Sequence, residues 1–496
     1  MIVKNLISCE PQEEASVPLT FDVVHPANQK VVFQVERSST ESCAKAVENC
    51  QRAFTSWKVS PLDHRCAIVE EAARLIEDES SGWAARLAAA NIQETSSTKW
   101  WTEFQLKDVT GFMRELIQAC KEVIQSQTIA GHNAEIIVDR EPFGVCLAIA
   151  AWNAVHLLTA RAIITPLLAG NTVVLKSSEH TPYTQRLWGE LLYAAGLPPG
   201  CLSVVHVAKE DASDLVSQLL ADKRIRHLNF TGSTAVGSIL ASLAGKHLKP
   251  TLMELGGKAP VLLLPDADLV TASSHIILGS FLNAGQICMS TERVLVAKSR
   301  YRELVAAIQE TWTNTSVSET PALFSSSSAE RVKSLIRDAR QKGASSVIGN
   351  DMESLSGSYV SRTILGPAQN DMEIYREETF GPVSIIVTID DESKSNDEVI
   401  DEMIELANDT DFGLTASVWS RNPVRALGVA RQLECGAVHI NAPTAADVPK
   451  VPHGGWKASG WGRFNGVEGI RSFTQTRSIE VGIGDPHALP LHIFDL

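Results

Sequence analysis

The chain has 496 residues, of which 44% are apolar, so it can build a large core but is too long for one ordinary domain, and two or three subdomains are expected. Acidic residues outnumber basic residues by 58 to 44, and the formal net charge of −14 argues against nucleic acid or an anionic membrane as the main partner. Nine cysteines without paired spacing argue against a disulfide framework or a zinc site, and residues 1–11 lack the apolar core of a signal peptide, so a cytoplasmic location is expected.

Helical periodicity dominates the first quarter of the chain, after a short predicted strand at Val31–Val35. Apolar residues recur at three- and four-residue intervals in four segments that we predict to be helices: Thr40–Trp57, Leu62–Ile76, Trp83–Thr95 and Phe104–Val123. We interpret these helices as a structural layer without catalytic residues. Residues 128–139 then alternate weakly, which predicts an extended strand that leaves the first domain.

From Gly144 onward, strands and helices alternate, which is typical of a parallel α/β architecture. The predicted strands are Val145–Ala151, Thr172–Lys176, Leu202–Val207, His227–Phe230, Val261–Leu264, Arg293–Ala297, Ser384–Ile389, Ala416–Trp419 and Ala437–Ile440. The predicted helices between them include Val155–Leu168, Tyr183–Ala195, Ser233–Leu243 and Arg331–Lys342. The Ser-rich stretch 324–328 and the acidic stretch 390–401 are predicted to be loops.

One uncharged stretch, residues 142–160, is long enough to span a bilayer. It contains Asn153, His156 and Thr159, and Pro142 and Gly144 open it, so a buried strand followed by a turn and a helix fits it better.

Two separate motifs carry the candidate chemistry. Cys288 follows an apolar run and Gly285, at a point where a helix is expected to meet a loop. Taken alone, this thiol could equally be a small buried packing residue. Glu254 lies in an apolar frame before Gly256 and Gly257, which would suit its carboxylate to act as a general base near neutral pH.

Together the two motifs, Glu-Leu-Gly-Gly-Lys from Glu254 and Gly-Gln-Ile-Cys ending at Cys288, resemble the aldehyde dehydrogenase superfamily in sequence, order and spacing. The resemblance implies an α/β fold with two Rossmann-like parallel domains and a small β oligomerisation extension. Residues 1–123 and 143–254 would form a discontinuous NAD-binding domain, residues 255–471 the catalytic domain, and residues 124–142 and 472–496 the oligomerisation strands.

In the family, the extension builds the interface of a homodimer or homotetramer. Phe473–Gly482 is the expected partner of the strand in residues 128–139, and a plain surface hairpin is the alternative.

A Gly-x-Gly-x-x-Gly fingerprint for dinucleotides is absent from the expected strand-to-helix turns, so the cofactor residues follow from other segments. Gly232 and Ser233 belong to a Phe-Thr-Gly-Ser-Thr segment that resembles the family's phosphate-binding motif and opens a predicted helix. Lys176 and Glu179 match the family's Lys-Pro-Ser-Glu, with Ser177 in place of proline. Glu179 would accept hydrogen bonds from the adenosine ribose and repel a 2′-phosphate, so NAD is expected rather than NADP. Without the resemblance, these residues would be an ordinary helix cap and surface charges.

The resemblance also implies a nicotinamide site. Glu378 and Phe380 lie in a Glu-Glu-x-Phe-Gly-Pro segment, where the family's second glutamate holds the nicotinamide ribose and the phenylalanine packs beside the ring. Trp152 and Leu255 complete the expected cofactor residues.

The implied reaction is covalent catalysis. Cys288 would attack the aldehyde carbon, and Asn153 and the Cys288 backbone N–H would bind the developing oxyanion. Hydride transfer to NAD would give a thioester, which water activated by Glu254 would hydrolyse to the acid, with no metal required. Proline usually precedes the family's tryptophan, but Ala151 stands there in this chain. A CoA-acylating relative, which typically lacks the glutamate, and a non-catalytic relative are the alternatives, and thiol esterase activity is a possible side reaction.

Segments around Arg161 and His439 look closest to the branch of the family that oxidises salicylaldehyde and vanillin, with an aliphatic aldehyde or semialdehyde as the alternative substrate. Arg161 lies about two helical turns beyond Asn153. It could face a hydroxyl or carboxylate on an aromatic aldehyde, or equally pair with a structural carboxylate. His453 replaces the family's phenylalanine in a Phe-Gly-Gly-x-Lys segment that lines the substrate tunnel.

Overall fold

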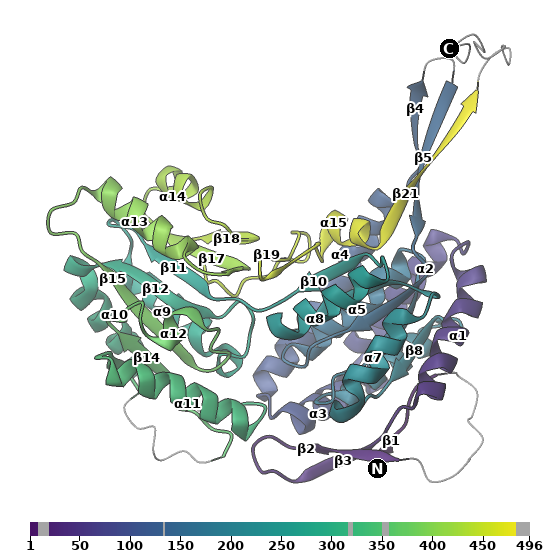
Figure 1. Ribbon diagram of the computed structural model, residues 1–496, viewed down its shortest axis with the longest axis horizontal. Helices are drawn as coiled ribbons and strands as arrows, with labels where there is room; N and C mark the ends of the chain where they lie inside the picture. Colours follow the sequence, from purple (N-terminus) through teal and green to yellow (C-terminus); the bar gives the residue numbers. More distant parts are fainter. Residues whose placement is uncertain (8–18, 132–133, 316–320, 350–356, 483–496) are drawn as a thin grey trace.

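Two large sheets covered by helices carry most of the chain, and a narrow three-stranded sheet projects from the body (Figure 1). The computed structural model describes residues 1–7, 19–131, 134–315, 321–349 and 357–482. The predictions for residues 8–11 and for the terminal part, 483–496, of the expected oligomerisation segment therefore lie outside the described residues. Among the described residues, no helix combines the length and apolar character needed to cross a membrane.

The first sheet has six strands in the order β20-β10-β9-β6-β7-β8. Their bounds are β6 Val145–Ile149, β7 Thr172–Lys176, β8 Leu202–Val205, β9 Ile225–Thr231, β10 Thr251–Glu254 and β20 Gly460–Trp461. All pairs are parallel except β10 with β20, where Met253 lies opposite Trp461. Every residue of β6 and β7 is buried, as expected for central strands covered by helices on both faces.

The second sheet has seven strands in the order β13-β14-β15-β12-β11-β17-β18. Their bounds are β11 Ala259–Leu263, β12 Thr291–Ala297, β13 Ser345–Ile348, β14 Thr363–Gly366, β15 Val383–Ile389, β17 Thr415–Trp419 and β18 Ala437–Ile440. Only the β13–β14 pair is antiparallel. Both sheets therefore have the Rossmann-like parallel character expected from the sequence, whereas the exact domain boundaries stay a prediction.

The helices cover both faces of the sheets, where the main apolar clusters lie. Around the first sheet are α1 Thr40–Trp57, α2 Leu62–Glu77, α3 Trp83–Thr95, α4 Lys99–Val123, α5 Val155–Leu168, α6 Pro182–Ala194, α7 Ala212–Ala221 and α8 Thr234–Lys246. The second half adds α9 Leu269–Phe281, α10 Tyr301–Asn314, α11 Ser326–Gln341, α12 Glu373–Arg376, α13 Asn396–Asn408, α14 Pro423–Ala430 and α15 Gly466–Ser472. Short 3₁₀ helices are η1 Glu79–Ser81, η2 Lys209–Asp211, η3 Leu282–Gly285 and η4 Lys298–Arg300.

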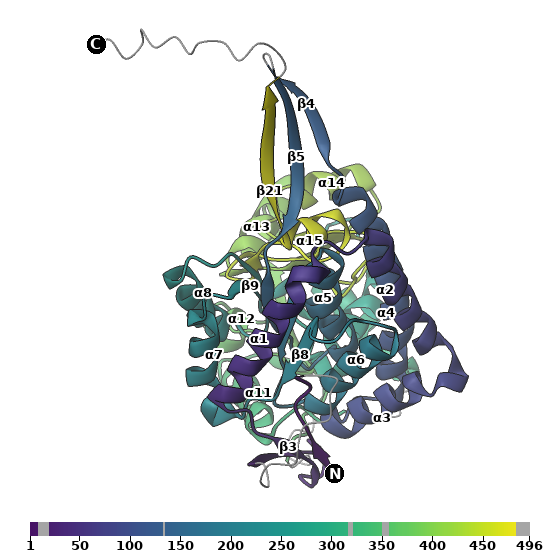
Figure 2. The ribbon, with the colours of Figure 1, turned by 90° about the vertical axis from the view of Figure 1, so that its right-hand side faces the viewer.

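The projecting sheet consists of β4 Gln127–Gly131, β5 Ala134–Pro142 and β21 Thr474–Gly482, and Figure 2 shows it standing away from the helices. The predicted pairing of the two distant segments is confirmed, because β5 and β21 run antiparallel with Ile137 opposite Ile479. Two small sheets complete the fold: β1 Ile2–Val3, β2 Thr20–Val24 and β3 Val31–Glu36 form one, and β16 Phe412–Gly413 with β19 Trp456–Lys457 forms the other.

Several predicted elements need correction. The stretch 324–328 is not entirely a loop, because Ser325 caps α11, which begins at Ser326. In the acidic stretch 390–401, Ser395 and Glu398 form a capping box that starts α13. Serine is polar enough to suggest a loop, but its hydroxyl also accepts hydrogen bonds from the first free amides of a helix. The single strand predicted in 128–139 is split between β4 and β5, and the uncharged stretch 142–160 is β6 and α5, as predicted.

Candidate active site

A tight turn presents Cys288. Helix α9 ends at Phe281, and η3 follows with left-handed backbone at Asn283, Ala284 and Gly285 (φ 49°, 56° and 69°). A side-chain carbon at Gly285 would overlap the carbonyl oxygen of Gly381. Glycine at 285 therefore lets the turn pack against the segment that carries the predicted nicotinamide residues, and the chain reaches Cys288 just before β12.

The three predicted catalytic residues meet in one cavity of about 280 Å³. Glu254 ends β10, Asn153 lies between β6 and α5, and Cys288 precedes β12, so the cavity draws on residues from both large sheets. Glu254 and Asn153 lie at or just beyond the carboxyl ends of β10 and β6, the usual place for ligands in α/β folds, whereas Cys288 lies near the amino end of β12.

Electrostatics around Cys288 favour the neutral thiol. Burial raises its pKa well above the ordinary value, and the negative charge of Glu254 raises it further. Glu254 is 1% exposed, and apart from the Cys288 thiol its carboxylate oxygens have no hydrogen-bond partner among the described residues. The thiol therefore needs a base when it attacks, and a carboxylate without other partners lies beside it.

Asn153 is held by the turn that carries Cys288. Its Nδ2 donates to the Gln286 carbonyl at 2.9 Å. The backbone carbonyl of Asn153 accepts hydrogen bonds from Trp101 Nε1 at 3.2 Å and from Asn283 Nδ2 at 3.1 Å. Because an amide nitrogen carries two hydrogens, the second N–H can donate to an oxygen of a ligand.

A second cavity, of about 500 Å³, runs along α7 and α8 and shares Trp152, Gly232 and Ser233 with the first. Ser233 caps α8 by accepting from the Val236 amide. The apolar lining includes Val216, Val236, Leu240 and Leu243.

Lys176 and Glu179 line the same cavity, and Lys176 Nζ lies 3.5 Å from Glu179 Oε2. Burial alone would raise the pKa of Glu179, but the charges of Lys176 and His180 outweigh it, so the pKa lies below its ordinary value. Glu179 is therefore an anionic acceptor within this cavity.

The predicted nicotinamide residues border the cavity that contains Cys288. Burial raises the pKa of Glu378 to about 7, and the Gly257 amide donates to its Oε1 at 3.0 Å. A side-chain carbon at Gly256 would lie 2.5 Å from the Glu378 carboxylate, so Gly256 makes room for this side chain. Leu255 is buried in the same wall, and the Phe380 ring lies 5.9 Å from the Trp152 ring.

Glu292, which no sequence motif indicated, holds the Glu378–Phe380 segment. Glu292 accepts hydrogen bonds from the Thr379 amide at 2.8 Å, the Thr379 hydroxyl at 2.6 Å and the Phe380 amide at 3.3 Å. Lys258, from the same motif as Glu254, forms a buried ion pair with Glu292. This pair ties the predicted base motif to the predicted cofactor segment.

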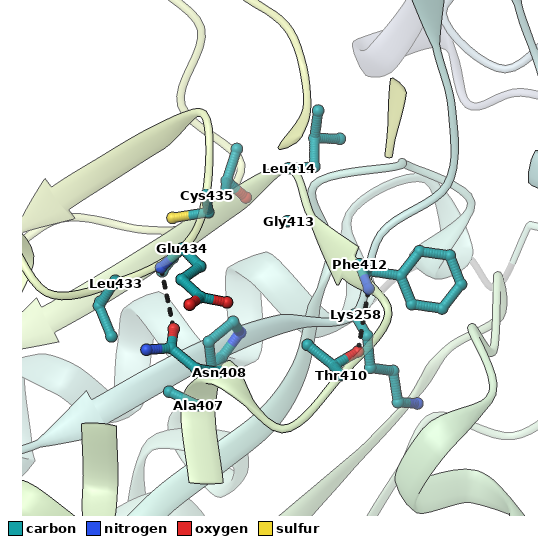
Figure 3. A pocket seen from close by; sticks show the side chains of 13 residues that line it. Lys258, Ala407, Asn408, Thr410, Phe412, Gly413, Leu414, Leu433, Glu434 and Cys435 are labelled. Atoms are coloured by element: carbon teal, nitrogen blue, oxygen red, sulfur yellow. Dashed lines mark hydrogen bonds between the residues drawn. The ribbon is translucent and has the colours of Figure 1, made fainter. Parts of the chain in front are cut away.

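Figure 3 shows a different pocket beside Lys258, with hydrogen bonds from the Glu434 amide to Asn408 and from the Phe412 amide to Thr410. Its free volume is about 10 Å³, enough for roughly one water, and none of the predicted site residues lines it.

Phe324, Arg331 and Gln286 were also missed as residues of the site. The Phe324 ring lies 4.7 Å from the Trp152 ring, and its amide donates to Gln286 Oε1 at 2.9 Å. Arg331 donates to the backbone carbonyls of Glu378 and Thr379. The Gly-Gln-Ile-Cys motif was the available signal for Gln286, whereas the segment around Phe324 fits the family pattern poorly.

The two predicted substrate residues differ in their surroundings. Arg161 is 3% exposed, pairs with Asp447 and donates through Nε to Asn465 at 2.9 Å. This agrees with the alternative that Arg161 pairs with a structural carboxylate, and a contact with substrate stays a prediction. His453 is 5% exposed and places Nε2 3.8 Å from Glu254 Oε1.

Comparison with known proteins shows the family of the chain. Residues 13–479 match the model of the aldehyde dehydrogenase family. The chain belongs to this family. A vanillin dehydrogenase from Pseudomonas sp. strain HR199 is 38% identical over 481 residues, which cover 95% of this chain and 96% of that protein.

Two solved structures illustrate the similarity of the fold. One is a salicylaldehyde dehydrogenase from Pseudomonas putida G7, complexed with salicylaldehyde, which is 34% identical in sequence to this chain. The superposition covers 99% of this chain and 100% of that chain, with a TM-score of 0.90. An NADP-dependent enzyme from E. coli is 28% identical, covers 97% and 98% of the two chains, and has a TM-score of 0.88.

Proposed function

We propose that this aldehyde dehydrogenase oxidises an aromatic aldehyde to the carboxylic acid with NAD, through a covalent intermediate on Cys288. The observation that carries the proposal is the meeting of Cys288, Glu254 and Asn153 in one cavity of about 280 Å³. This arrangement joins a nucleophile, a base and an oxyanion donor, as acyl transfer through a thioester requires.

The residues divide the reaction between them. Glu254 accepts the Cys288 proton as the sulfur attacks the aldehyde carbon, and the second N–H of Asn153 donates to the oxyanion of the thiohemiacetal. The nicotinamide cofactor, when bound, supplies the hydride acceptor for the oxidation to the thioester. Once the thioester has formed, Glu254 releases the thiol proton to solvent and is a carboxylate again. It then takes a proton from water as the water attacks the thioester, and the carbon–sulfur bond breaks, so that Cys288 leaves as a thiolate that takes up a proton from solvent before the next cycle.

The residues present fit a dinucleotide. The cavity along α7 and α8 offers apolar walls for a base, and Ser233 lies at a helix N-terminus suited to phosphate. Lys176 and Glu179 would hold the adenosine ribose, and Glu378, for which Gly256 leaves space, would hold the second ribose. The anionic Glu179 supports NAD over NADP, because it would repel a 2′-phosphate.

The aromatic substrate rests on two observations. Cys288 packs beside a buried apolar cluster of Trp101, Ile287, Met289 and Leu414, which suits a flat apolar ring. Similarity to a vanillin dehydrogenase and to a salicylaldehyde dehydrogenase supports the same substrate class.

The test is NADH formation, followed by absorbance, from salicylaldehyde, vanillin, benzaldehyde, a long-chain aldehyde and succinic semialdehyde, each with NAD⁺ and NADP⁺. We expect turnover of the aromatic aldehydes with NAD⁺ and none in a Cys288→Ala variant. Turnover of the aliphatic aldehydes alone would contradict the substrate, and faster turnover with NADP⁺ would contradict the cofactor. A folded wild-type protein that reduces neither cofactor would contradict the activity.

We further propose that the β4, β5 and β21 sheet forms the interface of a homodimer or homotetramer. Ile129, Ile479 and Val481 expose apolar side chains on it, and its outer strands leave edges that another chain can cover.

A further inference from the structure

His453 is fixed beside the predicted base. Its backbone exchanges two hydrogen bonds with Phe464, from the His453 amide at 2.9 Å and from the Phe464 amide at 2.8 Å. Phe464 is 1% exposed, so this bridge holds the histidine against the core. The ring Nε2 lies 3.8 Å from Glu254 Oε1, and both side chains are more than nine-tenths buried.

The facing atoms have no partner apart from the Cys288 thiol. Among the described residues, no group other than the Cys288 thiol donates to the oxygens of Glu254, and Nε2 of His453 makes no hydrogen bond. An unsatisfied buried polar atom is costly, so these atoms are expected to find a partner during the working cycle. The 3.8 Å separation is longer than a hydrogen bond, and a small rotation of either side chain or one water would close it.

Other titratable groups lie near enough to His453 to interact with it electrostatically. Burial would raise the pKa of Asp447, but Arg161 and then His453 outweigh it and hold it below its ordinary value. His439, on the half-buried strand β18, is close enough to Asp447 and His453 for both to affect its pKa. Asp108 contributes a further charge near Arg161 and Asp447. The Nε2 of His439 also lacks a partner among the described residues.

We propose that His453 receives the proton that Glu254 takes from the hydrolytic water. The proposal rests on the hydrolytic step of the proposed function. In that step the water oxygen bonds to the thioester carbon, the carbon–sulfur bond breaks, and one water proton moves to Glu254. Transfer of this proton from the Glu254 oxygen to Nε2 of His453 restores the carboxylate for the next cycle. His453 acts through Glu254 and is therefore a positioning residue.

The test uses 4-nitrophenyl acetate, because its hydrolysis needs acylation and deacylation of Cys288 but no cofactor. A burst of nitrophenolate reports acylation, and the following steady state reports deacylation. The variants are His453→Phe, which installs the residue usual in the family, His453→Gln, which keeps a polar group, and His453→Gly with imidazole added to the buffer. Cys288→Ala, which should give no burst, is the control.

In His453→Phe and His453→Gln we expect a burst that still corresponds to one acylated Cys288 per chain, and a steady-state rate lowered roughly tenfold or more. The pH profile of the steady state between pH 6 and 9 should lose one ionisation, and imidazole should restore the rate of His453→Gly. An unchanged rate, or a lower rate with the same pH profile and no rescue by imidazole, would overturn the proposal.

The two hypotheses fail separately in this design. A wild-type protein that hydrolyses the ester with the expected dependence on His453, but makes no NADH from any aldehyde, would remove the proposed oxidation and keep the proton route. If the protein forms NADH but its deacylation does not depend on His453, the proposed oxidation stands and the proton route is removed. A wild-type protein that gives neither nitrophenolate nor NADH would overturn both.

Discussion

Burial and the neighbouring Glu254 carboxylate both hold the Cys288 thiol in its protonated form. A Glu254→Gln substitution removes the negative charge and leaves the burial, so the thiolate should form at lower pH. We expect the pH midpoint of Cys288 alkylation by iodoacetamide to fall by roughly one unit or more. Mass spectrometry of the alkylated peptide over a pH series that extends into the alkaline range measures this midpoint.

Glu378→Gln is the matched control at the same site. Its charge also raises the pKa of Cys288 but ranks below the effect of Glu254, so its alkylation midpoint should fall less. A midpoint that stays constant or rises in Glu254→Gln would show that Glu254 does not act on the thiol as the geometry indicates.

The element that presents Cys288 is the η3 turn, and its shape depends on Gly285. In Gly285→Ala the added carbon meets the Gly381 carbonyl and also sits at positive φ, so the turn must move. We expect Cys288 to be alkylated more slowly than in the wild type. The free energy of unfolding, measured with urea, should fall by more than about 2 kcal/mol.

Gly82→Ala separates the clash from the backbone strain. Gly82 has φ 73°, close to the 69° of Gly285, but an added carbon there has no neighbour within 4 Å. It should cost only about 1 kcal/mol and leave Cys288 alkylation unchanged. Equal losses in the two variants would contradict the role of the close approach to Gly381.

Sequence patterns predicted the long elements well, because periodicity and caps are local. The bounds of α1, α3 and α5 agree with the prediction, and the two distant strands of the projecting sheet pair as expected. The addition of β20 to the first sheet was not predictable, because a two-residue strand has no periodicity.

Contacts between distant residues at the site were not predictable either, because local patterns do not encode them. Glu254 and Cys288 could be found from their motifs, but the pairing of Arg161 with Asp447 joins residues 286 positions apart.

At the scale of the whole molecule, buried histidines link stability to pH. Burial lowers the pKa of His156, His206 and His227 to about 3, whereas an unfolded histidine titrates near 6.5. Between these values the unfolded state binds protons that the folded state excludes, so acidification favours unfolding. Glu94 and Glu378 have the opposite effect on stability. Burial raises their pKa values to about 7, so the folded state binds their protons at a higher pH than the unfolded state does. Acidification therefore favours folding through these two groups, but only down to about pH 4.5, where the unfolded carboxyls also bind protons.

A single variant isolates the histidine contribution from these opposing groups. His227 lies with its ring 5.0 Å from the rings of Phe143 and Phe473, and His227→Gln removes its titration. As the pH falls below 6.5, the free energy of unfolding of this variant should rise relative to that of the wild type by up to about 1.4 kcal/mol for each pH unit. Urea unfolding of both proteins at pH 7.0, 5.5 and 4.5 measures the difference, with exposed His64→Gln as the control. A constant difference between His227→Gln and wild type across these pH values would mean that His227 titrates alike in the folded and unfolded protein, and would contradict the prediction.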